Sequence, residues 1–178
     1  MTDIRRLAYC DPPYPGMSGY YKDHPDLARS LHDYDGWVLH TASTTLGLVI
    51  QALRGEGWWL TTEDGAYRPG NYRVMAWVKP FAAFKRNVPV AYAWEPVLVK
   101  PCRKPVVSGR IVSRDWIAEP MTMQRGLVGA KPEAVCRWLF EVVGAEPEDE
   151  LVDMFPGSGA VTRAWERWRS ESRLEGLA

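Results

Sequence analysis

Four consecutive residues near the start of the chain, Asp11-Pro12-Pro13-Tyr14, combine a carboxylate, two prolines and an aromatic ring directly after the apolar run 7–10. Proline fixes φ, lacks an N–H and pushes the preceding residue into extended geometry, so this backbone is stiff. The Asp11 carboxylate and the Pro12 carbonyl can accept the two hydrogens of one planar amine, while Tyr14 offers a ring face. The pattern predicts a site for an amino group on a flat ring. A plain proline-rich turn with a solvated Asp11 fits the same residues.

A second segment whose residues could bind a ligand lies near the other end of the chain. Its sequence is Asp153-Met154-Phe155-Pro156-Gly157-Ser158-Gly159, the pattern of a strand, a glycine turn and a helix start. Glycines let the backbone approach a ligand closely, and a helix N-terminus presents unpaired N–H groups. The Asp153 carboxylate can hold a cationic or hydroxylated part of a small molecule. The Gly-Lys-Ser/Thr ending of a Walker loop is missing.

The elements that must position the first segment are predicted from hydrophobic spacing. They are strands over 7–10, 36–41 and 58–60, with a helix starting near Pro25 and another over 46–53. The order strand, helix, strand, helix, strand favours a sheet of parallel strands covered by helices. Asp11 then lies at the carboxyl end of a strand, where open α/β sheets bind ligands.

The second half of the chain predicts further strands and two helices. The strands are expected over 72–79, 90–99 and 151–155. The strand over 90–99 could run parallel or antiparallel to its neighbours. One helix begins at Pro132 and is closed by Gly144, and another follows the glycine turn. Residues 100–126 have few periodic cues and many charges, so we expect a loop or small insertion there.

Composition narrows the functional classes. A length of 178 residues suits one domain. Three cysteines without CxxC spacing argue against a disulfide framework and a zinc site, and the three histidines lack partner cysteines, so no metal is expected. No apolar run approaches the ~20 residues needed to span a bilayer, and no signal-type segment follows the N-terminus. We therefore expect a cytoplasmic protein with no membrane partner.

Charge is distributed unevenly although the net charge is zero. Residues 79–125 hold nine Lys or Arg against three Asp or Glu. Such a segment is either a surface that faces a polyanion or a loop kept soluble by charge, and the sequence favours neither. Arg103, Lys104 and Arg110 are the candidates for contact with nucleic acid. Trp94 and Trp116 could stack on bases, but packing into the core is the favoured interpretation.

Taken together, the two motifs resemble those of the circularly permuted S-adenosylmethionine (SAM)-dependent amino-methyltransferases. This family comprises DNA adenine and cytosine amino-methyltransferases and a related RNA adenine group. The resemblance extends to Gly129-Ala130-Lys131-Pro132, which is similar to the Lys-Pro element before the family's glycine motif, and to the strand around residues 94–99. It implies a single permuted methyltransferase domain over 1–178. The implied fold is a Rossmann-like α/β methyltransferase sheet, mostly parallel, with helices on both faces.

The resemblance also implies roles for individual residues. Asp11, Pro12, Pro13 and Tyr14 would form the catalytic motif, with Tyr14 stacked on a flipped-out base. SAM would donate methyl directly to the amine nitrogen, without a nucleophilic side chain. An aspartate, in place of serine, at the first position of this motif favours adenine over cytosine as the substrate base in the family. The residues implied to bind SAM are Cys10, Asp11, Lys131, Pro132, Asp153, Phe155, Gly157, Ser158 and Gly159.

The chain departs from the family pattern after the glycine motif. The family continues through a strand whose terminal acid holds the cofactor ribose, and through one more strand, whereas this sequence ends about ten residues after the expected helix. The sheet is thus expected to be truncated, and a second subunit of a homodimer could supply the ribose partner. Transfer of methyl to adenine in DNA is the favoured function. An RNA or small-amine methyltransferase and a catalytically degenerate binding module or complex subunit stay open.

Overall fold

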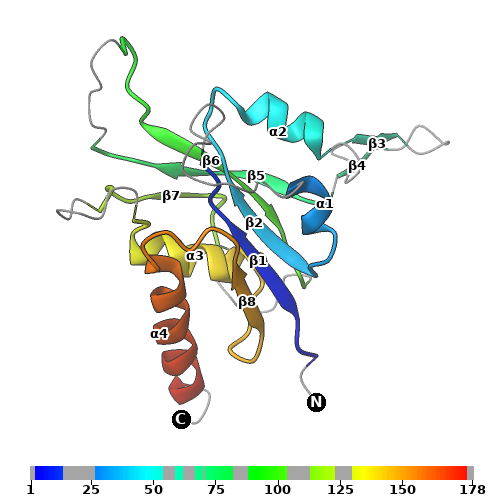
Figure 1. Ribbon diagram of the computed structural model, residues 1–178, viewed down its shortest axis with the longest axis vertical. Coiled ribbons are helices and arrows are strands. Elements are labelled where there is room, and N and C mark those ends of the chain that lie inside the picture. Colours follow the sequence, from blue (N-terminus) through cyan, green and yellow to red (C-terminus); the bar gives the residue numbers. More distant parts are fainter. Residues whose placement is uncertain are drawn as a thin grey trace.

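The computed structural model describes residues 3–13, 27–53, 59–61, 67–69, 71–81, 88–103, 113–122 and 130–175 (Figure 1). Six of the described strands form one sheet in the order β7-β5-β6-β2-β1-β8. Their bounds are β1 Arg6–Cys10, β2 Gly36–His40, β5 Arg73–Val78, β6 Trp94–Lys100, β7 Trp116–Ala118 and β8 Glu150–Asp153. Only β6 among these six runs against the others. The sheet is therefore mostly parallel, as expected.

The centre of the sheet is built from continuous apolar segments. Strand β2 is buried along its whole length, and β1 and β6 are each buried except at their ends. Runs of this kind are typical of strands covered on both faces. Strand β1 pairs in parallel with β2 on one side and with β8 on the other. These pairings place the residues after β1 and after β8 at the same edge of the sheet.

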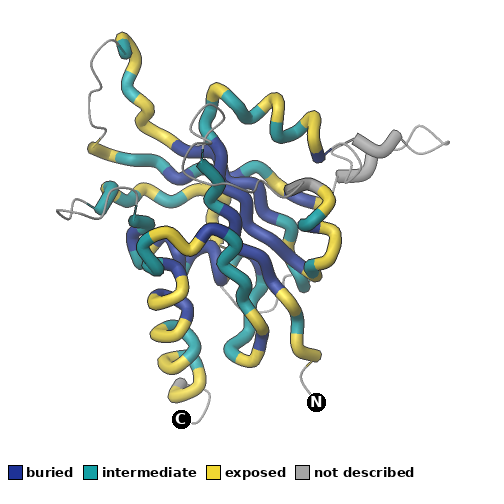
Figure 2. The backbone as a smooth tube through the Cα atoms, in the orientation of Figure 1, coloured by how far each residue is buried: buried dark blue, intermediate teal, exposed yellow. Residues whose placement is uncertain are grey.

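Helices cover both faces of the sheet (Figure 1). Helices α3, Glu133–Val143, and α4, Ala160–Glu175, enclose one core with Tyr9, Trp77 and their neighbours. Helices α1, Leu27–Leu31, and α2, Leu46–Ala52, lie on the other face over Trp37 and Leu39. The dark buried tube in Figure 2 follows the central strands between these two layers. The prediction of helices on both faces is confirmed.

Two sequence predictions of local structure are wrong. The strand expected at 58–60 is not part of the main sheet: β3, Trp59–Thr61, pairs antiparallel with β4, Tyr67–Pro69, in a sheet of its own. Five residues separate these strands, and a short connection permits an antiparallel hairpin whereas a parallel partner needs a crossover. Within 100–126, expected to be a loop or insertion, β7 extends the edge of the main sheet beside β5. Three residues are too few to produce a periodic signal.

The described sheet directs several strand ends to one edge. The carboxyl ends of β8, β1, β2 and β5 meet there, and the antiparallel β6 begins there, since Val78 pairs with Trp94 and His40 with Val97. We call this edge the carboxyl edge. No described helix has the length and apolar character needed to cross a bilayer. Among the described strands of the main sheet, β8 is the edge strand on one side and β7 is the edge strand on the other.

Candidate active site

The parallel pairing of β1 with β8 brings the two chemistry-bearing segments together. Tyr9 is in register with Asp153, and the Met154 N–H donates to the Tyr9 carbonyl at 2.9 Å. Asp11 follows β1 directly and the glycine turn follows β8 directly. The segments are more than 140 residues apart in the chain but lie side by side at the carboxyl edge.

Asp11 is held at this edge by Lys131. The Lys131 ammonium lies 3.1 Å from Asp11 Oδ1, and the Asp11 side chain is 30% exposed. Lys131 comes directly before Pro132, which is the N-cap residue of α3 and whose carbonyl accepts the Cys136 N–H. The structure thus brings together Asp11 and the Lys-Pro element. Pro12 and Pro13 are partly exposed beside Asp11, whereas Tyr14 lies outside the described residues.

Glu95, which the sequence analysis did not select, lies beneath Asp11 and is 3% exposed. Its carboxylate accepts from Lys131 and Lys79, each at 2.7 Å, and from His40 Nδ1 at 2.5 Å. Burial by itself raises the pKa of Glu95. The His40 hydrogen bond and the charges of Lys131 and Lys79 outweigh that effect and hold this pKa well below its ordinary range. Glu95 is therefore a buried anion shared by two cations.

His40 connects Glu95 to Tyr9. The Tyr9 hydroxyl lies 2.8 Å from His40 Nε2, and an O–H donated to Nε2 leaves the proton on Nδ1, which faces Glu95. Burial and the Lys131 charge lower the pKa of His40, so the ring is neutral in this network, while Glu95 opposes the shift. Burial raises the pKa of Tyr9 well above its ordinary value. His40 therefore has a specific role in packing and hydrogen bonding, which the sequence analysis did not predict.

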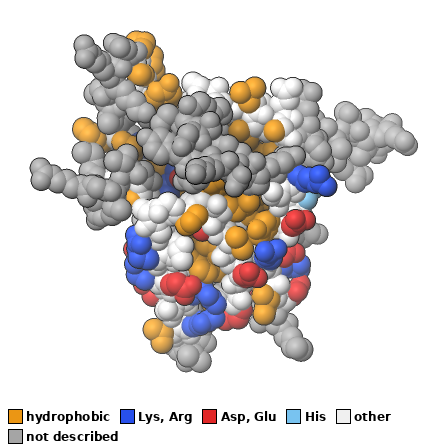
Figure 3. All heavy atoms as spheres, in the orientation of Figure 1, with side chains coloured by type: hydrophobic (Ala, Val, Ile, Leu, Met, Phe, Trp, Pro, Cys, Tyr) orange, Lys and Arg blue, Asp and Glu red, His pale blue; other side chains and the backbone are white. Residues whose placement is uncertain are grey.

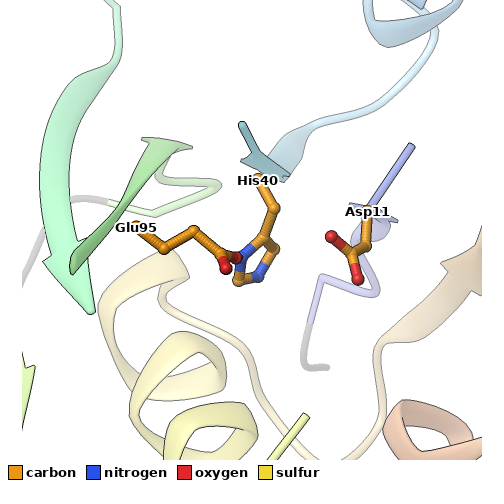
Figure 4. Close-up of side chains that lie close together, drawn as sticks. All are labelled: Asp11, His40 and Glu95. Carbon is orange, nitrogen blue, oxygen red and sulfur yellow. The ribbon is translucent and has the colours of Figure 1, made fainter. Parts of the chain in front are cut away.

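Asp11, His40 and Glu95 present ligand-type atoms within 4.8 Å of one another (Figure 4). In Figure 4 the Glu95 carboxylate meets the His40 ring, and the Asp11 carboxylate turns toward the same space. Two ammonium groups already contact Glu95, and one of them also contacts Asp11. A divalent cation would have to displace or repel these charges. We therefore assign these residues to an ion-pair cluster and not to a metal site.

The glycine turn after β8 has the geometry that its sequence predicts. Gly157 and Gly159 adopt positive φ angles of 45° and 69°, which side-chain-bearing residues rarely adopt. Asp153 Oδ1 accepts the Phe155 N–H at 3.2 Å, which closes the turn. The Ser158 carbonyl accepts from Arg163 of α4 at 3.0 Å, and Phe155 packs into the core on the α1 and α2 face.

Asp153 has one buried oxygen, Oδ2, with no hydrogen-bond partner among the described residues. Burial and the neighbouring Asp11 charge raise the pKa of Asp153, although hydrogen bonds from the Phe155 N–H and the Thr162 side chain oppose the rise. An orphaned carboxylate oxygen at a strand end is a site where a cationic group would be stabilised.

Two other predicted site residues take structural roles. Cys10 is fully buried, its thiol donates to Met154 Sδ at 3.2 Å, and burial raises its pKa, so it packs beneath the site.

Arg103 lies at the opposite end of the sheet from Asp11, because it follows β6, which runs antiparallel. Its guanidinium donates twice to Asp149, at 2.6 and 2.7 Å, and also to the Gly144 and Asp3 carbonyls. Arg103 therefore takes part in a structural ion pair, and its selection for contact with nucleic acid stays a prediction. Lys104 and Arg110 lie outside the described residues.

The two tryptophans expected in the core are instead exposed. Trp94 is 41% exposed and Trp116 is 44% exposed, the latter with Arg114 over its ring. Both lie at strand starts, where a terminal residue escapes the packing of the sheet. Together with Phe81, Val90 and Tyr92 they leave apolar surface around the connection between β5 and β6. Figure 3 shows exposed hydrophobic side chains at the upper left and also near the centre of this face.

Sequence reasoning missed Glu95, His40, Lys79 and Tyr9 as parts of the site. One signal was present for Glu95: it is a single acid at the start of an otherwise apolar strand, and such an acid needs partners when it is buried. Its partners come from β2, the end of β5 and the start of α3, so no local motif contains the cluster.

Comparison with known proteins shows the fold. No protein-family model matches the sequence, and no curated protein matches it. Among solved structures, the M1.HpyAVI–SAM complex is similar to this chain with a TM-score of 0.56 at 18% identity, over 92% of this chain and 78% of that chain. A second crystal structure of M1.HpyAVI gives a TM-score of 0.54 at 14% identity, over 93% and 76% of the two chains. The chain therefore has the same Rossmann-like α/β fold as M1.HpyAVI.

Proposed function

We propose that this protein transfers a methyl group from SAM to the exocyclic amine of a nucleic-acid base, with adenine in DNA as the substrate. The observation that carries the proposal is the pairing of β1 with β8. It places the Asp11 carboxylate and the glycine turn at adjacent strand ends, with Lys131 in contact with Asp11. The carboxylate that would accept hydrogen bonds from the amine and the turn that would bind the methyl donor are thus neighbours, as direct methyl transfer between two ligands requires.

Three observations support SAM as the second ligand. The similar structure of M1.HpyAVI is a complex with SAM. Gly157 and Gly159 form a turn in which the backbone can approach a ligand closely. The buried, unpartnered Asp153 Oδ2 suits the cationic amino group of an amino-acid moiety. Asp153, Phe155, Gly157, Ser158 and Gly159 would line this ligand, with Lys131 and Pro132 nearby.

Asp11 performs the chemistry that the site can supply. Its carboxylate and the Pro12 carbonyl would accept the two amine hydrogens, which favours a pyramidal nitrogen with an exposed lone pair. SAM, when bound, would supply a methyl group from its sulfonium sulfur to the amine nitrogen, with the thioether as the leaving group and one amine proton lost. The negative charge of Asp11 stabilises the positive charge that develops on that nitrogen, and its partial exposure gives the proton a route to water.

The exposed aromatic side chains support a nucleic-acid substrate. Trp94 directly precedes Glu95, so its exposed ring lies at the same edge of the sheet as Asp11. Aromatic rings on which bases stack contribute about 1–3 kcal/mol per base. This surface replaces Arg103 in our assignment of the substrate side.

Replacement of Asp11 tests the function. In Asp11→Ala we expect methyl transfer to adenine-containing DNA to fall by more than about 100-fold, because an oriented acceptor of this kind contributes at that scale. Calorimetric binding of S-adenosylhomocysteine, which lacks the sulfonium charge, should change by less than about threefold. Asp33→Ala, an exposed aspartate at the end of α1, is the matched control and should retain activity.

Each contrary outcome has a distinct meaning. Full activity in Asp11→Ala would remove Asp11 from the mechanism. Wild-type protein that binds SAM but methylates no DNA, RNA or small amine would be a binding module, and preference for RNA or for a small amine would correct the substrate. Wild-type protein that binds no SAM at millimolar concentration would refute the proposal.

A further inference from the structure

Four charged side chains form a compact cluster at the carboxyl edge. Asp11 follows β1, Lys79 follows β5, Glu95 belongs to β6 and Lys131 precedes α3. Lys131 lies 3.1 Å from Asp11 and 2.7 Å from Glu95, and Lys79 lies 2.7 Å from Glu95. Two positive and two negative charges therefore balance.

Glu95 is the member that joins the two cations. It is almost fully buried, and both of its oxygens are engaged, Oε1 by Lys131 and His40 and Oε2 by Lys79. Both ammonium groups also lie near the face of Trp77, at 4.5 and 5.2 Å from its centroid. Glu95 therefore fixes the Lys131 ammonium from below while Asp11 contacts it from the exposed side.

The balance would be lost without the Glu95 charge. Lys131 would then keep its contact with Asp11, and the four-residue cluster would carry one excess positive charge. That excess would lie next to the carboxylate that must attract an amine and next to the turn that would hold a cationic methyl donor. Asp153, the other acid facing this space, comes from β8 and interacts with the Asp11 charge, so it does not take the place of Glu95 between the two lysines.

We propose that Glu95 is a positioning residue that holds Lys131 against Asp11 and cancels the lysine charge, so that the site accepts the sulfonium of SAM. This inference rests on the proposed function and adds a residue to it. It requires that the charge of the cluster, and not merely its packing, determines how the site discriminates between a cationic and a neutral ligand.

SAM and S-adenosylhomocysteine are the probes that separate charge from packing. The first carries a sulfonium and the second a neutral thioether at the same position, so damage to the shared parts of the pocket weakens both. Calorimetry would measure both dissociation constants for wild type, Glu95→Gln, Lys79→Met and the double variant. Glu95→Gln keeps the size of the side chain and makes the cluster charge +1, Lys79→Met makes it −1, and the double variant restores zero.

We expect Glu95→Gln to weaken SAM relative to S-adenosylhomocysteine by about tenfold, the effect of one unit charge on another roughly 10 Å away in a partly buried site. Lys79→Met should shift the ratio in the opposite direction, and the double variant should return it close to the wild-type value. If Glu95→Gln fails to fold, Lys79→Met compared with wild type still tests the inference, because the expected shift of the ratio has the opposite sign.

An unchanged ratio, or equal weakening of both ligands in every variant, would overturn this inference while leaving the proposed function intact. Wild-type protein that binds neither ligand would instead refute the proposed function, and the inference with it. The two failures are therefore distinguishable in one set of titrations.

Discussion

Arg103 provides the sharpest test of how the structure reassigns a basic residue. We predict that Arg103→Met destabilises the fold, whereas a surface arginine that contacts nucleic acid would have almost no effect on stability. The Asp149 side chain is fully buried. It accepts two bonds from Arg103 and one each from the Arg5 and Glu146 N–H groups, both at 2.8 Å.

The magnitude follows from what remains after the substitution. Removal of one partner from a buried ion pair costs about 3–5 kcal/mol. The two backbone N–H groups stay on Asp149 after the guanidinium is lost, so we place the loss near the lower end, at about 3 kcal/mol. One kcal/mol shifts Tm by about 2–4 °C in a domain of this size, which gives a fall of roughly 6–12 °C. Urea and thermal unfolding at pH 7 measure both quantities.

The control is Arg73→Met, because Arg73 forms an exposed pair with Asp115 at 3.4 Å. Such surface pairs contribute about 0–1 kcal/mol. A loss in Arg103→Met that equals the loss in Arg73→Met would refute the structural role. In that case Arg103 would again be a candidate for contact with nucleic acid.

Acid provides a second measurement of the same pair. Burial raises the pKa of Asp149, but the Arg103 guanidinium and the two N–H groups outweigh it and hold the pKa below its ordinary value. The charged form therefore contributes stability that is complete above the unfolded pKa of about 3.9 and is lost as the pH falls toward the folded value. The difference in unfolding free energy between wild type and Arg103→Met should narrow below about pH 4. A difference that is constant from pH 7 to pH 3 would contradict this linkage.

Two further predictions use matched positions. Gly144→Ala should lose about 1 kcal/mol in urea unfolding, because Gly144 ends α3 at φ 76°. Gly47→Ala, inside α2 with open space around the added methyl, should gain up to about 1 kcal/mol, and the same sign for both would contradict the argument. Trp94→Ser should leave Tm within about 3 °C and weaken single-stranded DNA binding about tenfold, the lower part of the range for one stacked base. DNA binding by Trp94→Ser that stays at the wild-type level would place the nucleic acid elsewhere. Phe81→Ser, which replaces another exposed aromatic ring on the same surface, is the comparison variant.

The parts of the fold that could be predicted from the sequence are those with local signals. Apolar runs predicted β1, β2, β5 and β6, and Pro132 with Gly144 predicted the bounds of α3 to within one residue. The two motifs predicted where the carboxyl edge would carry chemistry, since strand ends in α/β sheets face one side. A strand at the position of β3 was expected, but its pairing away from the main sheet could not be predicted, and neither could the short edge strand β7. Their partners are chosen by chain geometry and not by hydrophobic spacing.

Arg103 and Lys131 show why charge along the sequence does not predict function. Both are basic residues, both contact an aspartate, and both are partly or largely buried. Arg103 meets a fully buried carboxylate at the end of the sheet away from Asp11, so its pair holds the start of β1 to the start of β8. Lys131 contacts a partly exposed carboxylate at the carboxyl edge, where a ligand can reach the same oxygen atoms. The direction of β6 decides which end of the sheet Arg103 occupies, and that direction is a property of strand pairing. Exposure of the acid partner, which only the folded chain shows, therefore distinguishes the two ion pairs.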